Sequence, residues 1–241
     1  PFPLYTQAHD GDWDNSFLGL NLELTLPYGI RPAFLLYIDD LHVSRLLALN
    51  FDTNGNKVAL QAGLSWAPPI EVPAVVSLTY TAVTPYMYTH FAQQPLNYLQ
   101  YVQFGSQLGS ILPPNSDQWS LRASLTPLPG FTVELWGKRT RHGNGSDYGE
   151  GSIDGDGSIW DDGQLPNGTV TFLDRSSFLS QPVLETVMQI GLDAEVDLRY
   201  RFLRARLGAG YALESVQNRD LDPGSPPEIN HVFSLTASFG L

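Results

Sequence analysis

A glycine-rich acidic segment holds the densest group of potential metal ligands in the sequence. From Gly143 to Gly163 the chain reads GNGSDYGEGSIDGDGSIWDDG, which contains six carboxylates. Carboxylate oxygens are the ligands that Ca²⁺ prefers, and glycine allows the tight turns of a chelating loop. The spacing differs from that of an EF-hand, so a hydrated acidic loop is the simpler interpretation and a Ca²⁺ site is the alternative. The ligands of such a site would be Asp154, Asp156, Asp161 and Asp162.

Between Pro85 and Gly109 aromatic rings are interspersed with side-chain amides, a combination suited to sugars. Aromatic faces pack against the apolar faces of sugar rings, and amides exchange hydrogen bonds with hydroxyl groups. The same side chains could instead pack against one another within a loop, and the sequence leaves both interpretations open. The candidate ligand-binding residues are Tyr86, Tyr88, His90, Asn97, Tyr98, Gln100, Tyr101 and Gln103.

Charges that alternate with uncharged residues mark a third stretch, which continues across an expected two-residue turn at Phe202 and Leu203. Such a row could line a permeation path or bind a ligand. Its acidic and basic members could also neutralise one another inside a plugged barrel, which is the favoured interpretation. The row consists of Asp193, Glu195, Asp197, Arg199, Arg201, Arg204 and Arg206.

Signatures of enzyme catalysis are weak in this chain. No G-x-S-x-G nucleophile motif occurs, and the five histidines lack the spacing of metal ligands. Asp39 and Asp40 form a carboxylate pair, but adjacent residues of a strand point to opposite faces and cannot flank one glycosidic bond. We therefore expect a protein that is not an enzyme.

The stretch from Leu184 to Arg201 determines where the charge row lies. Its even-numbered residues are mostly apolar and its odd-numbered residues mostly polar, which is the period of a β-strand. Strands of soluble proteins are usually about five or six residues long, whereas transmembrane strands need about nine to eleven. Burying an unpaired charge in a dry core would cost roughly several kcal/mol of folding free energy, whereas a charge that faces a water-filled lumen stays solvated. The pattern predicts one wall of an outer-membrane β-barrel, with the apolar side toward lipid.

The same alternation recurs along the chain and predicts nine strands, with one further short strand possible within Tyr98–Phe104. Bacterial barrels of one chain have even strand numbers, so a tenth strand is expected at Pro1–Gln7 or upstream of Pro1. The nine segments are Ser16–Leu26, Pro32–Asp39, Lys57–Trp66, Pro73–Thr84, Gln118–Thr126, Phe131–Arg141, Leu184–Arg201, Arg204–Glu214 and Asn230–Leu241.

Short and long connections between these segments alternate strictly, as in outer-membrane barrels with short periplasmic turns and long external loops. Trp66 and Tyr200 beside short turns, with Trp119 and Tyr211 nearer long loops, fit two aromatic girdles. The predicted turns are Pro27–Arg31, Ala67–Val72, Pro127–Gly130 and Phe202–Leu203. The predicted long connections are Asp40–Asn56, Pro85–Asp117, His142–Pro182 and Ser215–Ile229.

Composition agrees with this fold class. The 241 residues include no cysteine, and no apolar run approaches the length of a transmembrane helix. The net charge of −12 argues against nucleic acid as a partner, because phosphate binding needs a basic surface. We expect a single all-β domain over residues 1–241, a transmembrane antiparallel up-and-down β-barrel or the C-terminal part of a larger one, in the bacterial outer membrane with its lipid as partner.

Several stretches resemble the capsule-assembly outer-membrane proteins of the Wzi type. They are AFLLYIDDLHV (Ala33–Val43), PYMYTH (Pro85–His90), NYLQYVQFGSQLGSILPPNSDQ (Asn97–Gln118) and LRASLTPLPGFTVELWGKRTRHGNG (Leu121–Gly145). The resemblance implies a large barrel with an N-terminal periplasmic helical bundle and a lectin-like role in attaching capsular polysaccharide. This chain lacks the bundle and is short for that barrel. A non-enzymatic barrel that binds or anchors surface polysaccharide is the function expected, and a porin or passive channel is the alternative.

Overall fold

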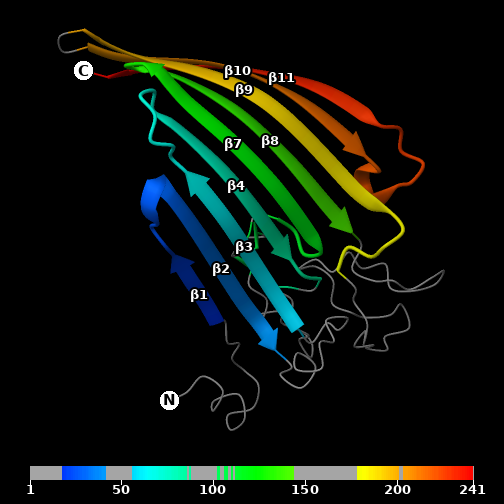
Figure 1. Ribbon diagram of the computed structural model, residues 1–241. Helices are drawn as coiled ribbons and strands as arrows, with labels where there is room; N and C mark the ends of the chain where they lie inside the picture. The colour runs from blue at the N-terminus through cyan, green and yellow to red at the C-terminus, as the bar shows by residue number, and fades with distance from the viewer. Residues whose placement is uncertain are drawn as a thin grey trace, which may run out of the picture.

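The computed structural model describes residues 18–41, 56–85, 87, 102–103, 106–107, 110, 112–143, 178–200 and 203–240. These residues form an all-β structure whose main element is one nine-stranded sheet, with strand order β1-β2-β3-β4-β7-β8-β9-β10-β11. Every neighbouring pair in it is antiparallel. The sheet is therefore an up-and-down meander that curves and twists along its width (Figure 1).

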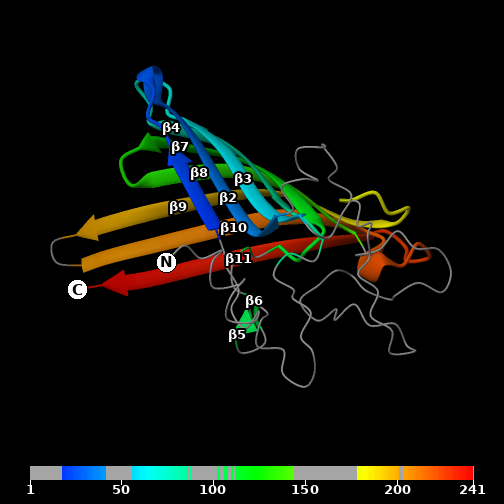
Figure 2. The same cartoon turned by 90° about the horizontal axis from the view of Figure 1, so that it is seen from below.

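All nine predicted strands are confirmed in this sheet. Its members are β1 (Leu18–Glu23), β2 (Ile30–Leu41), β3 (Asn56–Trp66), β4 (Ala74–Val83), β7 (Ser116–Leu128), β8 (Phe131–Gly143), β9 (Leu184–Tyr200), β10 (Leu203–Gln217) and β11 (Glu228–Gly240). Two-residue strands β5 (Val102–Gln103) and β6 (Ser106–Gln107) pair with each other off the large sheet (Figure 2). Single-turn 3₁₀ helices occupy Pro27–Gly29 and Arg219–Leu221.

The strand register gives the large sheet two chemically different faces. Directly paired residues share a face, as do residues two apart along a strand. We call the face that carries Leu22, Leu121 and Leu192 the apolar face, and the opposite face, with Arg122 and Glu134, the polar face. The predicted division of apolar and polar residues between the two sides is thus confirmed.

Large side chains of the apolar face are exposed rather than packed in a core. Leu235 and Phe239 keep 87% and 73% of their surface accessible, and Leu192 keeps 50%. The few fully buried apolar residues of the described chain, such as Val83 and Met87, lie at one end of the sheet instead. Among the described residues, no second sheet packs against this apolar face.

Long connections all leave from one end of the sheet and short ones from the other, as predicted, because consecutive strands are antiparallel. Two of the turns are tighter than predicted. Tyr28 and Gly29 reverse the chain with φ of 62° and 76°, so Ile30 already pairs with Trp66. The reversal after β7 needs only Pro129 and Gly130.

The turn between β9 and β10 also lies one residue earlier than predicted. Leu203 pairs with Tyr200, so the connection consists of Arg201 and Phe202 rather than Phe202 and Leu203. Arg201, which was predicted to belong to the lumenal charge row, lies in this connection and outside the described residues.

The register drifts steadily across the sheet, which tilts the strands. Strand β2 begins at Ile30, beside a short turn, and Phe34 lies four residues further along. The row of residues paired in sequence across the sheet connects Phe34 with Tyr80 of β4 and Met188 of β9. In β9 this row is twelve residues from the corresponding end at Tyr200. A stagger of this kind accompanies the strand tilt of β-barrels.

The sheet nevertheless remains open. Within the described residues β1 pairs only with β2, and β11 pairs only with β10. The segment Pro1–Gln7, predicted to supply a tenth strand, lies outside the described residues. The structure therefore shows a barrel-like meander with two free edges rather than a closed barrel.

Helices contribute little to the described part of the chain, and none there has the length and apolar character needed to cross a bilayer.

Candidate functional site

Trp136 of β8 is the largest side chain in the middle of the polar face. It pairs with Arg122 of β7 on one side and with Gly191 of β9 on the other. Glu134 and Asp193 pair with each other two residues further along the same strands. The register therefore places one indole ring, one guanidinium and two carboxylates on the same side of the sheet.

Gly191 lets the Trp136 ring lie against the neighbouring strand. A Cβ atom at position 191 would come closer than 3.0 Å to ring atoms Cε2, Cζ2 and Nε1, so only glycine leaves room for the ring there. The indole Nε1 donates a hydrogen bond of 2.6 Å to Oδ2 of Asp193. Gly191 and Asp193 together thus hold the indole ring close to β9.

Charged groups surround this ring. The Lys138 ammonium lies 5.4 Å from the ring centroid, within the range of a cation–π interaction. Arg122 forms an ion pair with Glu134, which leaves the Asp193 carboxylate bound to the indole. The result is an aromatic ring with the Lys138 ammonium over it and charged hydrogen-bonding groups of both signs nearby, which we call the Trp136 platform (Arg122, Glu134, Trp136, Lys138 and Asp193).

Neutral polar groups extend the platform toward the long connections. Gln189 donates to Glu214 at 2.7 Å, and Asn230 donates to the other oxygen of the same carboxylate at 3.2 Å. Gln118 donates to the Thr140 hydroxyl at 2.9 Å on the neighbouring strands. These side chains, which we call the polar ladder (Gln118, Thr140, Gln189, Glu214 and Asn230), offer hydroxyl, amide and carboxylate partners along the polar face.

The predicted charge row lies on the polar face at the end nearer the short turns. The Arg206 side chain forms an ion pair with Glu195 of the neighbouring strand at 3.3 Å, and the Arg199 side chain forms one with Asp197 of its own strand at 3.1 Å. These contacts fit the expectation that opposite charges of the row compensate one another. Asp193 differs from the others, because its hydrogen bond goes to the Trp136 indole.

The alternation within Phe131–Arg141 puts Trp136 on the polar side of its strand, next to Glu134 and Lys138, but Trp136 is not among the candidate residues of the sequence analysis. The signal was present, since an indole in an otherwise hydrophilic row is unusual. What the sequence did not reveal was its partner, because Trp136 and Gly191 are brought together only by the β8–β9 register.

Side chains from the long connections are buried against the polar face at the opposite end. Met87 and Leu112 pack with Ala59 and Val83, and Tyr37 packs against that cluster. Met87 and Leu112 therefore cover part of the polar face at this end of the sheet.

Asn115, the residue before β7, holds neighbouring segments together at this end of the sheet. It is fully buried with φ of 53°, and its Nδ2 donates to Gln181 Oε1 at 3.0 Å. Its Oδ1 accepts from the Leu179 amide at 2.9 Å, and its carbonyl accepts from Gly143. One side chain thus links the start of β7 to the segment that leads into β9.

A serine–histidine pair lies beside Asn115. The Ser116 hydroxyl and Nδ1 of His142 are 2.9 Å apart. A nucleophilic serine must be reachable by substrate, but Ser116 is fully buried. We interpret the pair as support for the strand ends.

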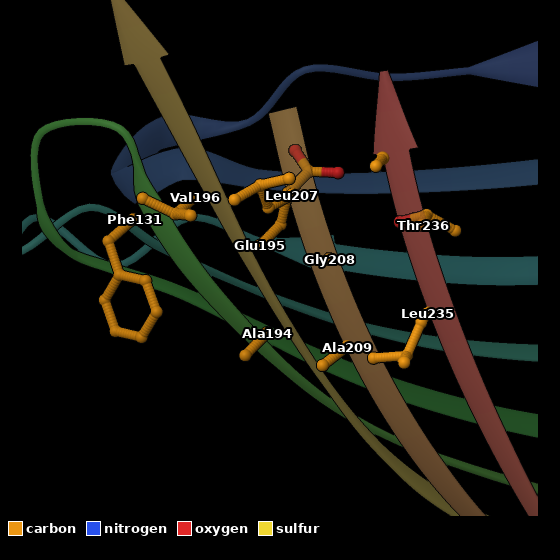
Figure 3. Close-up of a pocket in the computed structure, with 10 residues that line it drawn as sticks. Phe131, Ala194, Glu195, Val196, Leu207, Gly208, Ala209, Leu235 and Thr236 are labelled. Carbon is orange, nitrogen blue, oxygen red and sulfur yellow. The ribbon is translucent and has the colours of Figure 1, made fainter. Parts of the chain in front are cut away.

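A shallow groove of about 480 Å³ lies on the apolar face, on the other side of the sheet from the platform. Its floor includes Ala194 and Ala209, and the larger side chains of Phe131, Leu207 and Leu235 border it (Figure 3). The lining is almost entirely aliphatic and aromatic, so the groove suits hydrocarbon rather than a polar ligand.

The other predicted ligands lie largely outside the described residues. These are Tyr86, Tyr88, His90, Asn97, Tyr98, Gln100 and Tyr101 of the aromatic segment, and Asp154, Asp156, Asp161 and Asp162 of the acidic loop. Gln103 is described only as part of the backbone of β5. Within the described residues, no three His, Asp or Glu side chains are grouped as metal ligands.

Comparison of the chain with protein-family profiles, with curated proteins and with solved structures gave no match.

Proposed function

We propose that this chain forms nine strands of a bacterial outer-membrane β-barrel that binds surface polysaccharide along its polar face and is not an enzyme. The observation that carries the proposal is the division of one long-stranded sheet into an exposed apolar face and a hydrogen-bonding polar face. The resemblance to Wzi-type proteins points to the same class of ligand.

The membrane part of the proposal follows from the exposed apolar area. Side chains such as Leu192 of β9 and Leu235 and Phe239 of β11 are strongly exposed, and contact with hydrocarbon gains roughly 25 cal/mol for each Å² of apolar surface removed from water. A lipid bilayer covers such a face without requiring a second protein layer. Open strand edges are costly in lipid, so in the membrane β1 and β11 must pair with further strands.

The polysaccharide part rests on the Trp136 platform. A flat ring held by Gly191 and Asp193 is preorganised for stacking against the apolar face of a sugar. Glu134, Arg122 and the polar ladder supply partners for hydroxyl groups around it. A long ladder suits an extended, repetitive ligand better than a single small molecule.

The binding test compares two tryptophan variants of the chain in nonionic detergent. Retention on immobilised capsular polysaccharide is measured for the parent chain, Trp136→Ala and Trp66→Ala. Loss of the platform ring should weaken retention about tenfold, on the order of 1.4 kcal/mol. Trp66 lies on the apolar face at the end of β3 and serves as the matched control. Equal retention by all three proteins would contradict the proposed site.

A passive channel is the second candidate, favoured by the hydrogen-bonded polar side chains along β7 to β11. It is distinguished by conductance across a planar bilayer. Large and stable ion conductance without glycan retention would support the channel and reject the polysaccharide binder. The side chains buried on the polar face around Met87 favour an occluded interior.

A further inference from the structure

Arg139 of β8 occupies an unusual place, because it points from the apolar face. Its paired neighbours on that face are Trp119 of β7 and Met188 of β9. Among the described strand residues of this face, the register leaves only three that are Asp, Glu, Lys or Arg, namely Asp117, Arg139 and Arg141. Their formal charges sum to +1 in a chain of net charge −12.

The negative member of this group is already engaged. Asp117 is almost fully buried, and its Oδ1 accepts a hydrogen bond of 2.9 Å from Nε of Arg141. Arg141 also contacts the other carboxylate oxygen, which in addition accepts from the Tyr80 hydroxyl at 3.2 Å. Asp117 is therefore committed to Arg141 and Tyr80.

Arg139 is exposed, and within the described part of the chain it has no acidic partner. Aromatic rings lie next to it, since Tyr80 and Trp119 are tilted against each other with centroids 4.6 Å apart. This level of the sheet is only four residues from Gly143, where β8 enters a long connection. Tryptophan, tyrosine and arginine gather at the level of lipid headgroups, where the rings meet hydrocarbon and the cation meets phosphate.

We propose that Arg139 binds the phosphate of a lipid headgroup in the leaflet next to the long connections. A guanidinium offers parallel N–H donors that match two phosphate oxygens. Arg141 lies at the next position on the same face, and because Asp117 compensates its charge, the net positive charge of this group is that of Arg139. Trp119 and Tyr80 supply the ring surface for the upper part of the acyl chains. This inference rests on the membrane location proposed above but not on polysaccharide binding.

The experiment uses the full chain in nonionic detergent and counts lipid adducts by native mass spectrometry. The probes are phosphatidylglycerol, diacylglycerol with the same acyl chains, and inorganic phosphate. Phosphatidylglycerol should be retained and diacylglycerol should not. Inorganic phosphate should compete only at far higher concentration, because it lacks the acyl chains that the apolar face binds.

Arg139→Gln should weaken phosphatidylglycerol retention about fivefold, which corresponds to roughly 1 kcal/mol for one cation near an anionic headgroup. Phosphatidylglycerol retention by Arg139→Lys should fall between that of the parent chain and that of Arg139→Gln, since lysine keeps the charge but lacks the paired N–H donors. Arg204→Gln is the matched control, because Arg204 lies on the polar face at the other end of the sheet. Equal retention by Arg139→Gln and the parent chain overturns the lipid site, as does equal competition by inorganic phosphate.

Insertion into vesicles, measured on the same proteins, separates this inference from the proposed function. A chain that inserts but does not distinguish phosphatidylglycerol from diacylglycerol overturns the phosphate site alone. A chain that fails to insert overturns the membrane location and the phosphate site together.

Discussion

Substitution of Gly191 by alanine is the sharpest test of the Trp136 platform. The new Cβ would lie closer than 3.0 Å to three atoms of the indole ring. The ring must then move by about 1 Å to restore normal carbon–carbon contact. That movement disrupts the 2.6 Å hydrogen bond from Nε1 to Asp193, so the platform loses both its orientation and its carboxylate partner.

The expected cost follows from these two changes. A hydrogen bond to a charged group contributes roughly 1.5–3 kcal/mol, and a displaced rotamer costs roughly 0.5–1.5 kcal/mol. Alanine itself recovers roughly 0.5–1 kcal/mol relative to glycine in a strand. We therefore expect Gly191→Ala to lower the free energy of unfolding by about 1–4 kcal/mol and to weaken polysaccharide retention to the same extent as Trp136→Ala.

Gly137→Ala is the matched control, because it lies in β8 next to Trp136 but on the apolar face. Its Cβ would meet the Gln189 carbonyl oxygen at 3.6 Å, an ordinary contact, so the free energy of unfolding should rise by roughly 0.5–1 kcal/mol instead of falling. Denaturant unfolding in detergent, followed by circular dichroism, measures both variants. In the Trp136→Ala background the cost of Gly191→Ala should vanish, since the clash has no partner. Additive costs in the double variant would refute the reasoning.

Three further predictions concern the sheet face, the long connections and the acidic loop. Leu235→Arg should cost up to about 2–4 kcal/mol in a bilayer, whereas Thr236→Arg on the polar face should cost little, as vesicle-based unfolding would reveal; equal costs would argue against lipid contact. Asn115→Ala removes the two buried side-chain hydrogen bonds to Leu179 and Gln181 and should cost roughly 1–3 kcal/mol, with faster amide exchange at Leu179; unchanged exchange would contradict the linking role of Asn115. Calorimetric titration should detect Ca²⁺ binding that Asp154→Asn reduces, and absence of heat at millimolar Ca²⁺ would exclude the site.

Local pattern in the sequence was sufficient to predict the sheet. Period-two alternation specifies a strand and its two faces wherever it occurs, as between Leu184 and Tyr200, because side-chain direction depends only on position along the strand. Alternating connection lengths then specified which strand ends meet. The strand ends were predicted less well: β7 and β10 extend beyond their predicted bounds, and positive φ at Tyr28, Gly29 and Gly130 completes two reversals in fewer residues than expected.

The candidate sites depended on information that no single strand contains. Trp136 becomes a platform only because the register sets it opposite Gly191, and Arg139 lacks an acidic partner in the described chain only because Asp117 is committed to Arg141 and Tyr80. Those pairings join residues that are far apart in sequence, so they depend on turn geometry and strand stagger summed over several strands. The sequence by itself determined the two faces of the sheet, and only the tertiary structure decided which side chains meet on them.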